Sequence, residues 1–156
     1  MQFEHLIAIT DPGNPLVMPL SREQLWQGLM ERVENPLPFL PGLESCTVIE
    51  RTSQGLLREL DFGPATIHDR VTLMEAHWVR FDIVASATHA GGALTITIEE
   101  PQPGFLFLRF AYRTTLASSP DSEDRAYVEY VKSAYHQSDL DCVRIIRTLA
   151  AKGTPQ

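Results

Sequence analysis

The stretch 121–151 constrains the fold most, because its apolar residues recur at the alternating three- and four-residue steps of a helix. At about 1.5 Å per residue, a helix of this length is a rod of roughly 45 Å. Leu140 and Val143 interrupt its polar side and hint at a further contact. A rod cannot bury an apolar stripe against itself, so the rest of the chain must supply a broad apolar surface. The stripe consists of Val128, Val131, Tyr135, Ser138, Cys142, Ile145 and Leu149.

The chain before the rod supplies that surface as strands, since its apolar residues alternate with a period of two. The joints between most of these segments are short, which favours antiparallel pairing of neighbours. Seven such strands make a twisted sheet that can curl around the rod. The segments with this pattern are 2–10, 44–52, 56–63, 66–74, 77–85, 93–100 and 105–116.

A helix and an irregular segment separate the first two strands. Ser21 is a good N-cap, Gln24 completes a capping box, and Asn35-Pro36 ends the helix. Residues 37–43 predict a short bent helical piece or a tight connector. We therefore predict an α+β fold, with a curved seven-stranded antiparallel sheet wrapped around a long C-terminal helix and two short helices between strands 1 and 2. Residues 1–156 would form one domain, frayed at 152–156.

Charge and motif content argue against several classes of function. The formal net charge is −7 and no basic patch is present, so we expect no nucleic-acid partner. No run of about 18 apolar residues occurs, which predicts no membrane insertion. Cys46 and Cys142 are too few for a disulfide framework, and free thiols favour a cytoplasmic location. Without CxxC, HxxxH, P-loop or dinucleotide motifs, we expect neither a metal nor a cofactor.

The most informative local pattern lies in the two strands joined by Gly63-Pro64. A tight hairpin there places three pairs on one face: Leu56 with Val71, Arg58 with Asp69, and Leu60 with Ile67. The apolar partners indicate an inward face, and pairing would offset the cost of burying Arg58 and Asp69. This pair is either a polar anchor or acid–base element for a ligand, or an ion pair that fixes the register or lies at the sheet rim.

Alternation along the other strands extends the predicted inner wall. Tyr112 and Tyr135 each carry a hydroxyl that needs a partner, either a ligand or the backbone of the core. Phe105 and Phe107 fall on the outer face, where they predict an oligomer contact such as a homodimer, or else cover by the rim or helices. The predicted ligand-binding wall consists of Arg58, Leu60, Ile67, Asp69, Val71, Phe81, Ile96, Phe110, Tyr112, Val131 and Tyr135.

Other side chains with reactive or large groups receive no site role. Trp26 is predicted to pack the first helix on the sheet edge. Cys142 lies on the core stripe with no base near it in the sequence, so we interpret it as a packing residue. No ligand pattern, and hence no catalytic role, is assigned to the histidines: His5, His68, His77, His89 and His136.

Several segments together resemble one known family. They are Leu20-Ser21-Arg22-Glu23-Gln24-Leu25-Trp26-Gln27-Gly28-Leu29, Glu34-Asn35-Pro36 with Phe39, Leu57-Arg58-Glu59 followed by Phe62-Gly63, Asp69-Arg70-Val71, and Phe107 to Tyr112. These residues resemble the AtaL-like family of the START and birch-pollen-allergen (SRPBCC) superfamily. The resemblance implies a helix-grip fold with a deep apolar cavity under the long helix. Because that superfamily includes carriers, polyketide aromatases and cyclases, and ring-hydroxylase subunits, the resemblance implies a ligand pocket and not a reaction.

The functional prediction is a protein that binds a small or medium apolar molecule in a cavity of about 300–1,000 Å³ between sheet and rod. One alternative is a cofactor-free polyketide cyclase, aromatase or dehydratase, in which Arg58, Asp69 or a tyrosine handles a proton. Another is a protein-interaction module with a filled core that works through its outer sheet face.

Overall fold

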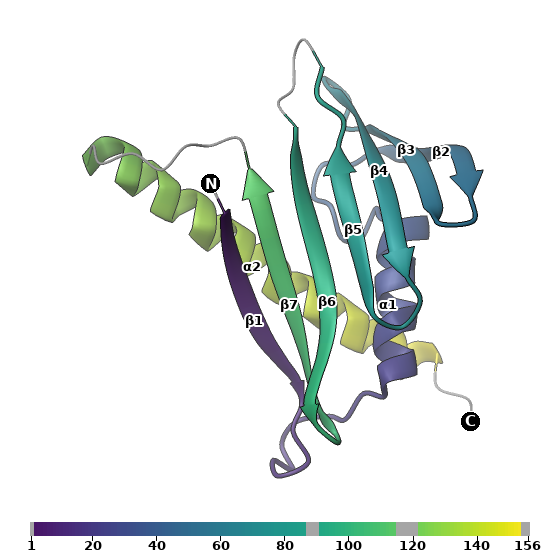
Figure 1. The fold of residues 1–156 in the computed structure, drawn as a ribbon, viewed down its shortest axis with the longest axis vertical. Coiled ribbons are helices and arrows are strands. Elements are labelled where there is room, and N and C mark those ends of the chain that lie inside the picture. The colour runs from purple at the N-terminus through teal and green to yellow at the C-terminus, as the bar shows by residue number, and fades with distance from the viewer. Residues whose placement is uncertain (1, 87–90, 115–121, 154–156) are drawn as a thin grey trace.

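The computed structural model describes residues 2–86, 91–114 and 122–153, and of residues 122–128 it describes the backbone alone. Figure 1 shows the strands in one sheet that α2 crosses. The predicted α+β architecture is confirmed. The elements follow the order β1 (Gln2–Thr10), α1 (Arg22–Glu34), β2 (Ser45–Thr52), β3 (Gly55–Asp61), β4 (Thr66–Met74), β5 (Trp78–Ile83), β6 (Gly92–Gln102), β7 (Phe105–Thr114) and α2 (Ser122–Gly153).

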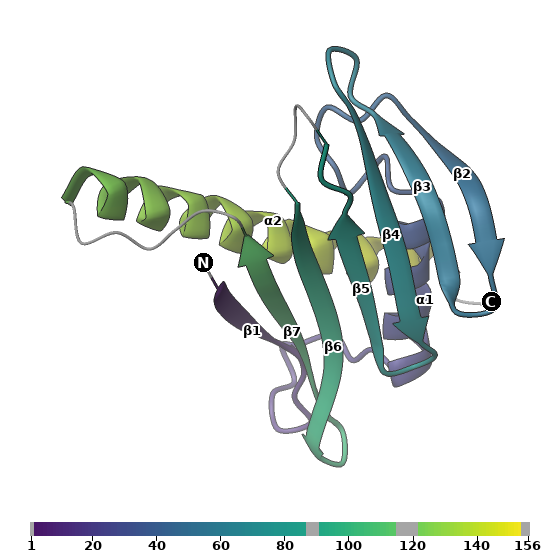
Figure 2. The same ribbon diagram turned by 45° about the horizontal axis from the view of Figure 1, so that its top comes forward.

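The sheet is antiparallel throughout, in the order β1-β7-β6-β5-β4-β3-β2. β1 pairs with β7, so β5 lies at the centre, and the curved sheet faces α2 (Figure 2). The predicted register between β3 and β4 is confirmed. Its Cα partners include Leu56 with Val71, Arg58 with Asp69, and Leu60 with Ile67.

The start of α1 follows the predicted capping box. Ser21 Oγ accepts a hydrogen bond from the Gln24 N–H at 3.0 Å, and Gln24 Oε1 accepts one from the Ser21 N–H at 2.9 Å. Asn35 forms the C-cap. In the following connector, the N–H groups of Phe39 and Leu40 both donate to Pro36 O, which makes a single helical turn in the segment predicted as a bent helical piece or connector.

The buried face of α2 is rotated from the predicted stripe, and centres on Asp139, Cys142, Val143 and Ile146. The further contact that Val143 hinted at is present, because this part of α2 packs against α1 as well as the sheet and Val143 is buried, whereas Leu140 is exposed. A Cβ on Gly28 of α1 would lie only 2.5 Å from Ile146 Cγ2, so the two helices need a glycine at this crossing. Neither helix of the described ranges is both long enough and apolar enough to cross a lipid bilayer.

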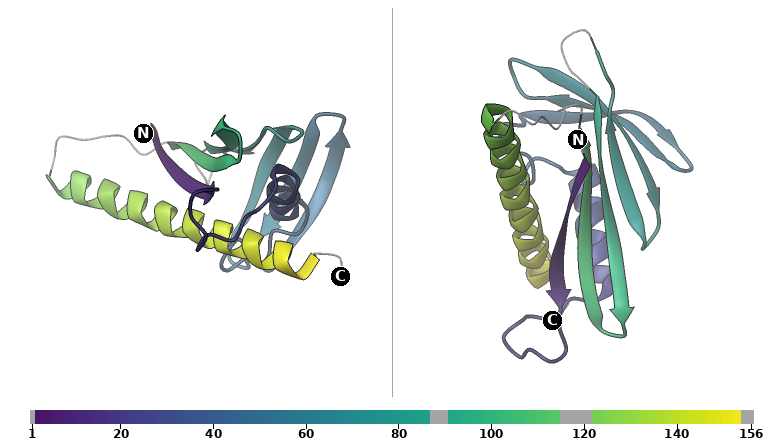
Figure 3. Two further views of the ribbon diagram at one scale, coloured as in Figure 1. Left: turned by 90° about the horizontal axis from the view of Figure 1, so that it is seen from below. Right: turned by 60° about the vertical axis from the view of Figure 1, so that its left-hand side comes forward.

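The N-terminal half of α2 extends past the edge strand β1, as Figure 3 shows from two sides. The sheet therefore covers less of the predicted stripe in this half of the helix. Tyr135 is 37% exposed and Val131 is half-buried. The side chain of Val128, His89 and the segment 154–156 lie outside the described residues. Phe105 and Phe107 are half-buried, and a homodimer contact through them stays a prediction.

Candidate functional site

A buried ion pair joins β3 to β4 on the inner face of the sheet. Arg58 Nε lies 2.8 Å from Asp69 Oδ1, and Arg58 Nη2 lies 2.5 Å from Asp69 Oδ2. The two side chains are 2% and 5% exposed. The pair is thus two-pronged and inward-facing, and it does not lie on a solvent-exposed rim.

The same arginine also binds the end of α1. Arg58 Nη1 donates to the carbonyl oxygens of Arg32 at 3.3 Å and Val33 at 2.9 Å. Carbonyl groups in the last turn of a helix have no partner within that helix. Arg58 therefore caps α1 and fixes its C-terminal end to the sheet, which gives the ion pair a structural role whether or not it meets a ligand.

A cavity of about 380 Å³ lies between the inner face of the sheet, the end of α1 and α2. Its apolar lining comes mainly from β3, β4, β5 and β6. Its polar lining consists of side chains from α1, α2 and several strands. The main apolar contributors are Leu40, Leu60, Phe62, Ile67, Phe81, Ile83 and Leu94, and the polar ones are Arg32, Arg58, Asp69, Tyr112, Arg113, Thr114, Tyr135 and Ser138.

Most of the predicted wall residues line this cavity: Arg58, Leu60, Ile67, Asp69, Phe81, Tyr112 and Tyr135. Val71, Ile96 and Phe110 are fully buried in the core but do not line it. Val131 on α2 is not among the lining residues either. Alternation selects the face of a strand and not the depth along it, so it cannot separate cavity wall from packed core. Arg32, Leu40 and Phe62 line the cavity without having been predicted, because Arg32 lies in α1 and the other two lie in connectors outside the strands.

A network of three side chains joins the cavity to β1. The Tyr112 hydroxyl donates to Asp139 Oδ1, and His5 Nδ1 lies 2.7 Å from Asp139 Oδ2. Asp139 is 1% exposed, whereas the His5 side chain is 13% exposed. The ring centroids of His5 and His136 lie 4.5 Å apart. The five histidines were given no site role, yet His5 contacts a buried carboxyl group that meets a cavity tyrosine.

Burial dominates the protonation of this network. It raises the pKa of Asp139, although the hydrogen bonds from Tyr112 and His5 act to lower it. Burial, together with the nearby Asp139 carboxylate, also raises the pKa of Tyr112 above its usual range, so this hydroxyl keeps its proton. In its protonated form the Tyr112 phenol can donate a hydrogen bond or a proton to a ligand oxygen, and it cannot act as a base.

Aromatic rings pack around the tyrosine end of the network. Tyr112 stacks on Phe3 with ring centroids 5.0 Å apart, and the ring of Tyr135 lies 4.4 Å from that of Tyr112. Phe3 is the cross-strand partner of Tyr112 in the β1–β7 ladder. The stacking holds the Tyr112 ring at the cavity wall with its hydroxyl directed to α2.

The two cysteines are free, with Cys46 half-buried and Cys142 buried. Burial raises the pKa of both thiols, so neither is an activated nucleophile. Within the described ranges, no group of three or more His, Cys, Asp or Glu side chains could hold a metal ion.

A second depression, of about 930 Å³, lies between α1 and α2. Its floor includes Gly28, Ile146 and Leu149, and its edge carries Glu23 and Lys152. It holds none of the buried polar side chains described above. We therefore place the candidate site in the cavity under α2.

Comparison with protein families matches residues 7–153 to a family described as AtaL, acetylaranotin biosynthesis cluster protein L. A search of curated protein sequences finds no match.

Several solved structures have a similar fold. The Zhui aromatase/cyclase from Streptomyces sp. R1128 superposes with a TM-score of 0.67 at 16% identity, over 99% of each chain. A START superfamily protein from Mycobacterium smegmatis has a TM-score of 0.64 at 9% identity, over 95% of this chain and 98% of that one. Ara h 8.0201 has a TM-score of 0.60 at 11% identity, over 95% and 98%. These likenesses confirm the helix-grip fold of the START and birch-pollen-allergen superfamily, and at such low identity they bear on the fold alone.

Proposed function

The chain belongs to the AtaL family, and from this premise and the cavity under α2 we propose that it binds a small hydrophobic molecule between the sheet and α2. The observation that carries the proposal is a cavity of about 380 Å³ with a largely apolar and aromatic lining and a few convergent polar groups. Ligand sites typically have volumes of about 300–1,000 Å³ and this kind of lining. An interaction module with a filled core is less well supported, because this core is not filled.

Filling the cavity should block binding. We expect the neutral dye N-phenyl-1-naphthylamine to bind the protein with enhanced fluorescence, and Ile67→Trp to weaken that binding at least about tenfold, because Ile67 lines the cavity and the larger ring would occupy it. Fluorescence titration measures the dissociation constant. The matched control is Ile49→Trp, since Ile49 is 51% exposed on β2, outside the cavity.

Equal dye affinity in Ile67→Trp and in the wild-type protein would contradict a ligand site in this cavity. Native mass spectrometry of the gently purified protein, compared with a denatured sample, gives a second readout. A non-covalent mass that disappears on denaturation would support an occupied cavity and would reveal the class of the natural ligand.

A second candidate function is acid–base catalysis on the bound molecule, and the Tyr112–Asp139–His5 network favours it. Tyr112 would donate its proton to a carbonyl or hydroxyl oxygen of the ligand. Asp139 would then return a proton to Tyr112, with His5 as the link toward solvent. A structural neighbour is an aromatase/cyclase, which makes such chemistry compatible with the fold, but only the network in this chain argues for it.

Solvent exchange of an enolisable ketone tests this candidate. We expect the protein to speed the exchange of the α-hydrogens of 2-tetralone for deuterium in D₂O, with Tyr112 protonating the carbonyl oxygen while water takes the α-proton. Tyr112→Phe should lower the protein-dependent rate about 100-fold, within the usual range for general acid catalysis. Tyr130→Phe is the matched control, since Tyr130 is 72% exposed on α2. NMR measures the exchange rates. A rate that the protein does not raise, or a rate in Tyr112→Phe equal to that in the wild-type protein, would contradict this candidate.

A further inference from the structure

Arg32 is a buried cation at the cavity, and no described carboxylate forms an ion pair with it. The residue is 8% exposed and lines the cavity. Its Nη1 has no hydrogen-bond partner within the described ranges, and no ion pair found there includes Arg32. A buried charge without a counter-charge is costly, so its retention calls for an explanation.

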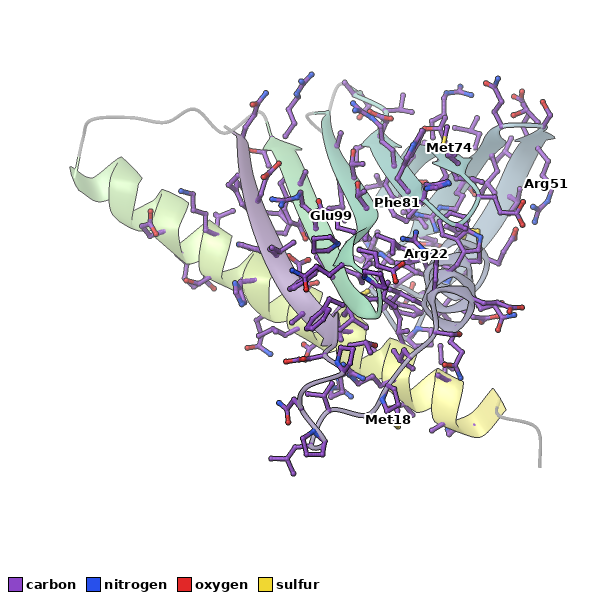
Figure 4. The ribbon with its side chains drawn as sticks, turned by 60° about the horizontal axis from the view of Figure 1, so that its bottom comes forward. Met18, Arg22, Arg51, Met74, Phe81 and Glu99 are labelled. Atoms are coloured by element: carbon purple, nitrogen blue, oxygen red, sulfur yellow. The ribbon has the colours of Figure 1, made fainter. Side chains whose placement is uncertain are left out.

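The neighbouring arginine shows the contrast. The guanidinium carbons of Arg32 and Arg58 lie 5.4 Å and 5.2 Å from the ring centroid of Phe81, which Figure 4 places in the middle of the sheet. The ring stabilises both cations partly through its π face. Asp69 neutralises Arg58 through two hydrogen bonds, whereas no carboxylate does so for Arg32. Among the described residues, Arg32 is therefore a cation at the cavity end over Phe81 that no carboxylate binds directly.

No other group on the neighbouring elements supplies the missing anion. The end of α1 favours a cation, but the carbonyl oxygens of Arg32 and Val33 already accept from Arg58. Asp139 on α2 lies near enough for the Arg32 charge to act to lower its pKa, but no ion pair joins the two side chains. The Asp139 carboxyl group is bonded to Tyr112 and His5 instead, and burial, the largest influence, raises its pKa. Burial likewise raises the pKa of the Cys142 thiol. The counter-charge must come from outside this set.

We propose that the hydrophobic ligand carries a carboxylate, and that this group pairs with Arg32 over the ring of Phe81. A guanidinium is planar and presents its N–H groups as a fork that matches a carboxylate, and a small rotation would give Nη1 its missing acceptor. The apolar remainder of the ligand would lie along Leu60, Ile67 and Leu94. This inference rests on the proposed ligand-binding function and adds the chemical class of the ligand.

A pair of isosteric competitors tests the charge separately from the cavity. Naphthalene-2-carboxylate and naphthalene-2-carboxamide have nearly the same size and shape, and each is titrated against bound N-phenyl-1-naphthylamine. In the wild-type protein the carboxylate should displace the dye at a concentration at least about tenfold lower than the amide. In Arg32→Gln that preference should disappear, and because both competitors are titrated against the same dye, their ratio does not depend on the affinity for the dye. Arg32→Met, also uncharged, is the second variant.

Arg144→Gln is the control with the same change in net charge, because the Arg144 side chain is 68% exposed on α2. It should keep the preference for the carboxylate. An amide that competes as well as the carboxylate in the wild-type protein, or a preference that survives in Arg32→Gln and Arg32→Met, would overturn the assignment of the anion to Arg32. Failure of the dye to bind the wild-type protein would instead overturn the proposed function itself, so the two failures are distinguishable.

Discussion

Replacing Arg58 with Met is expected to lower the free energy of unfolding by about 3–5 kcal/mol, the usual loss when one partner of a buried ion pair is removed. The substitution leaves Asp69 buried without its counter-charge. It also leaves the carbonyl oxygens of Arg32 and Val33 without their donor at the end of α1. Urea denaturation followed by circular dichroism measures the loss.

The chain offers a matched control for this prediction. Arg51 Nη2 lies 2.7 Å from Glu34 Oε2, but these side chains are 59% and 36% exposed, and Arg51 lies at the outer edge of the sheet (Figure 4). Arg51→Met should therefore cost less than about 1 kcal/mol. The double variant Arg58→Met/Asp69→Leu removes both buried charges and should recover about half of the loss or more. A loss in Arg58→Met no larger than that in Arg51→Met would contradict a structural role for the buried pair.

The β3–β4 hairpin shows what the sequence could predict and where prediction stopped. A turn at Gly63-Pro64 and apolar partners on one face are enough to set the register, and the pairing of Arg58 with Asp69 follows from it. The second partner of Arg58, the end of α1, could not be predicted. That contact depends on how a helix more than twenty residues away packs on the sheet, and no local pattern carries this information.

The long helix shows where spacing alone does not choose between neighbouring residues. Asp139 follows Tyr135 by four residues and precedes Cys142 by three, so spacing allows it on the inward face. Steps of three and four residues fit Ser138 as well as Asp139 between Tyr135 and Cys142, and the predicted stripe includes Ser138. The partners, Tyr112 and His5, come from strands at opposite ends of the chain.

Strand β1 carried a similar signal. His5 alternates with Phe3, Ile7 and Ile9, all of which point to the inner face of the sheet. A histidine in the middle of an inward-facing strand needs a polar partner, and an aspartate on the inward face of the rod supplies one. Reading the two faces together would have identified this part of the network.

Substitutions at Asp139 should separate its role as an acceptor from its charge. Asp139→Ala removes the acceptor of the Tyr112 hydroxyl and the contact of His5. Unpartnered buried polar groups cost about 1–3 kcal/mol each, so we expect a loss of about 2–3 kcal/mol in the free energy of unfolding. Asp139→Asn keeps an oxygen acceptor in nearly the same place and should lose much less. Urea denaturation of both variants at neutral pH measures the two losses, and equal losses would contradict the acceptor role.

The pH dependence of Asp139→Asn tests the charge. Burial raises the pKa of Asp139 above 3.8, so the folded state holds its proton at pH values where the unfolded chain has released it. The stabilisation from this group is therefore complete below pH 3.8 and is lost as the pH rises through the folded-state pKa. An asparagine does not titrate, so Asp139→Asn should gain stability relative to the wild-type protein as the pH rises from about 4 toward 8. A His5→Gln background removes the imidazole that contacts Asp139 from the comparison. A stability difference in that background that stays constant, or that shrinks with rising pH, would show that burial does not raise the pKa of this carboxyl group.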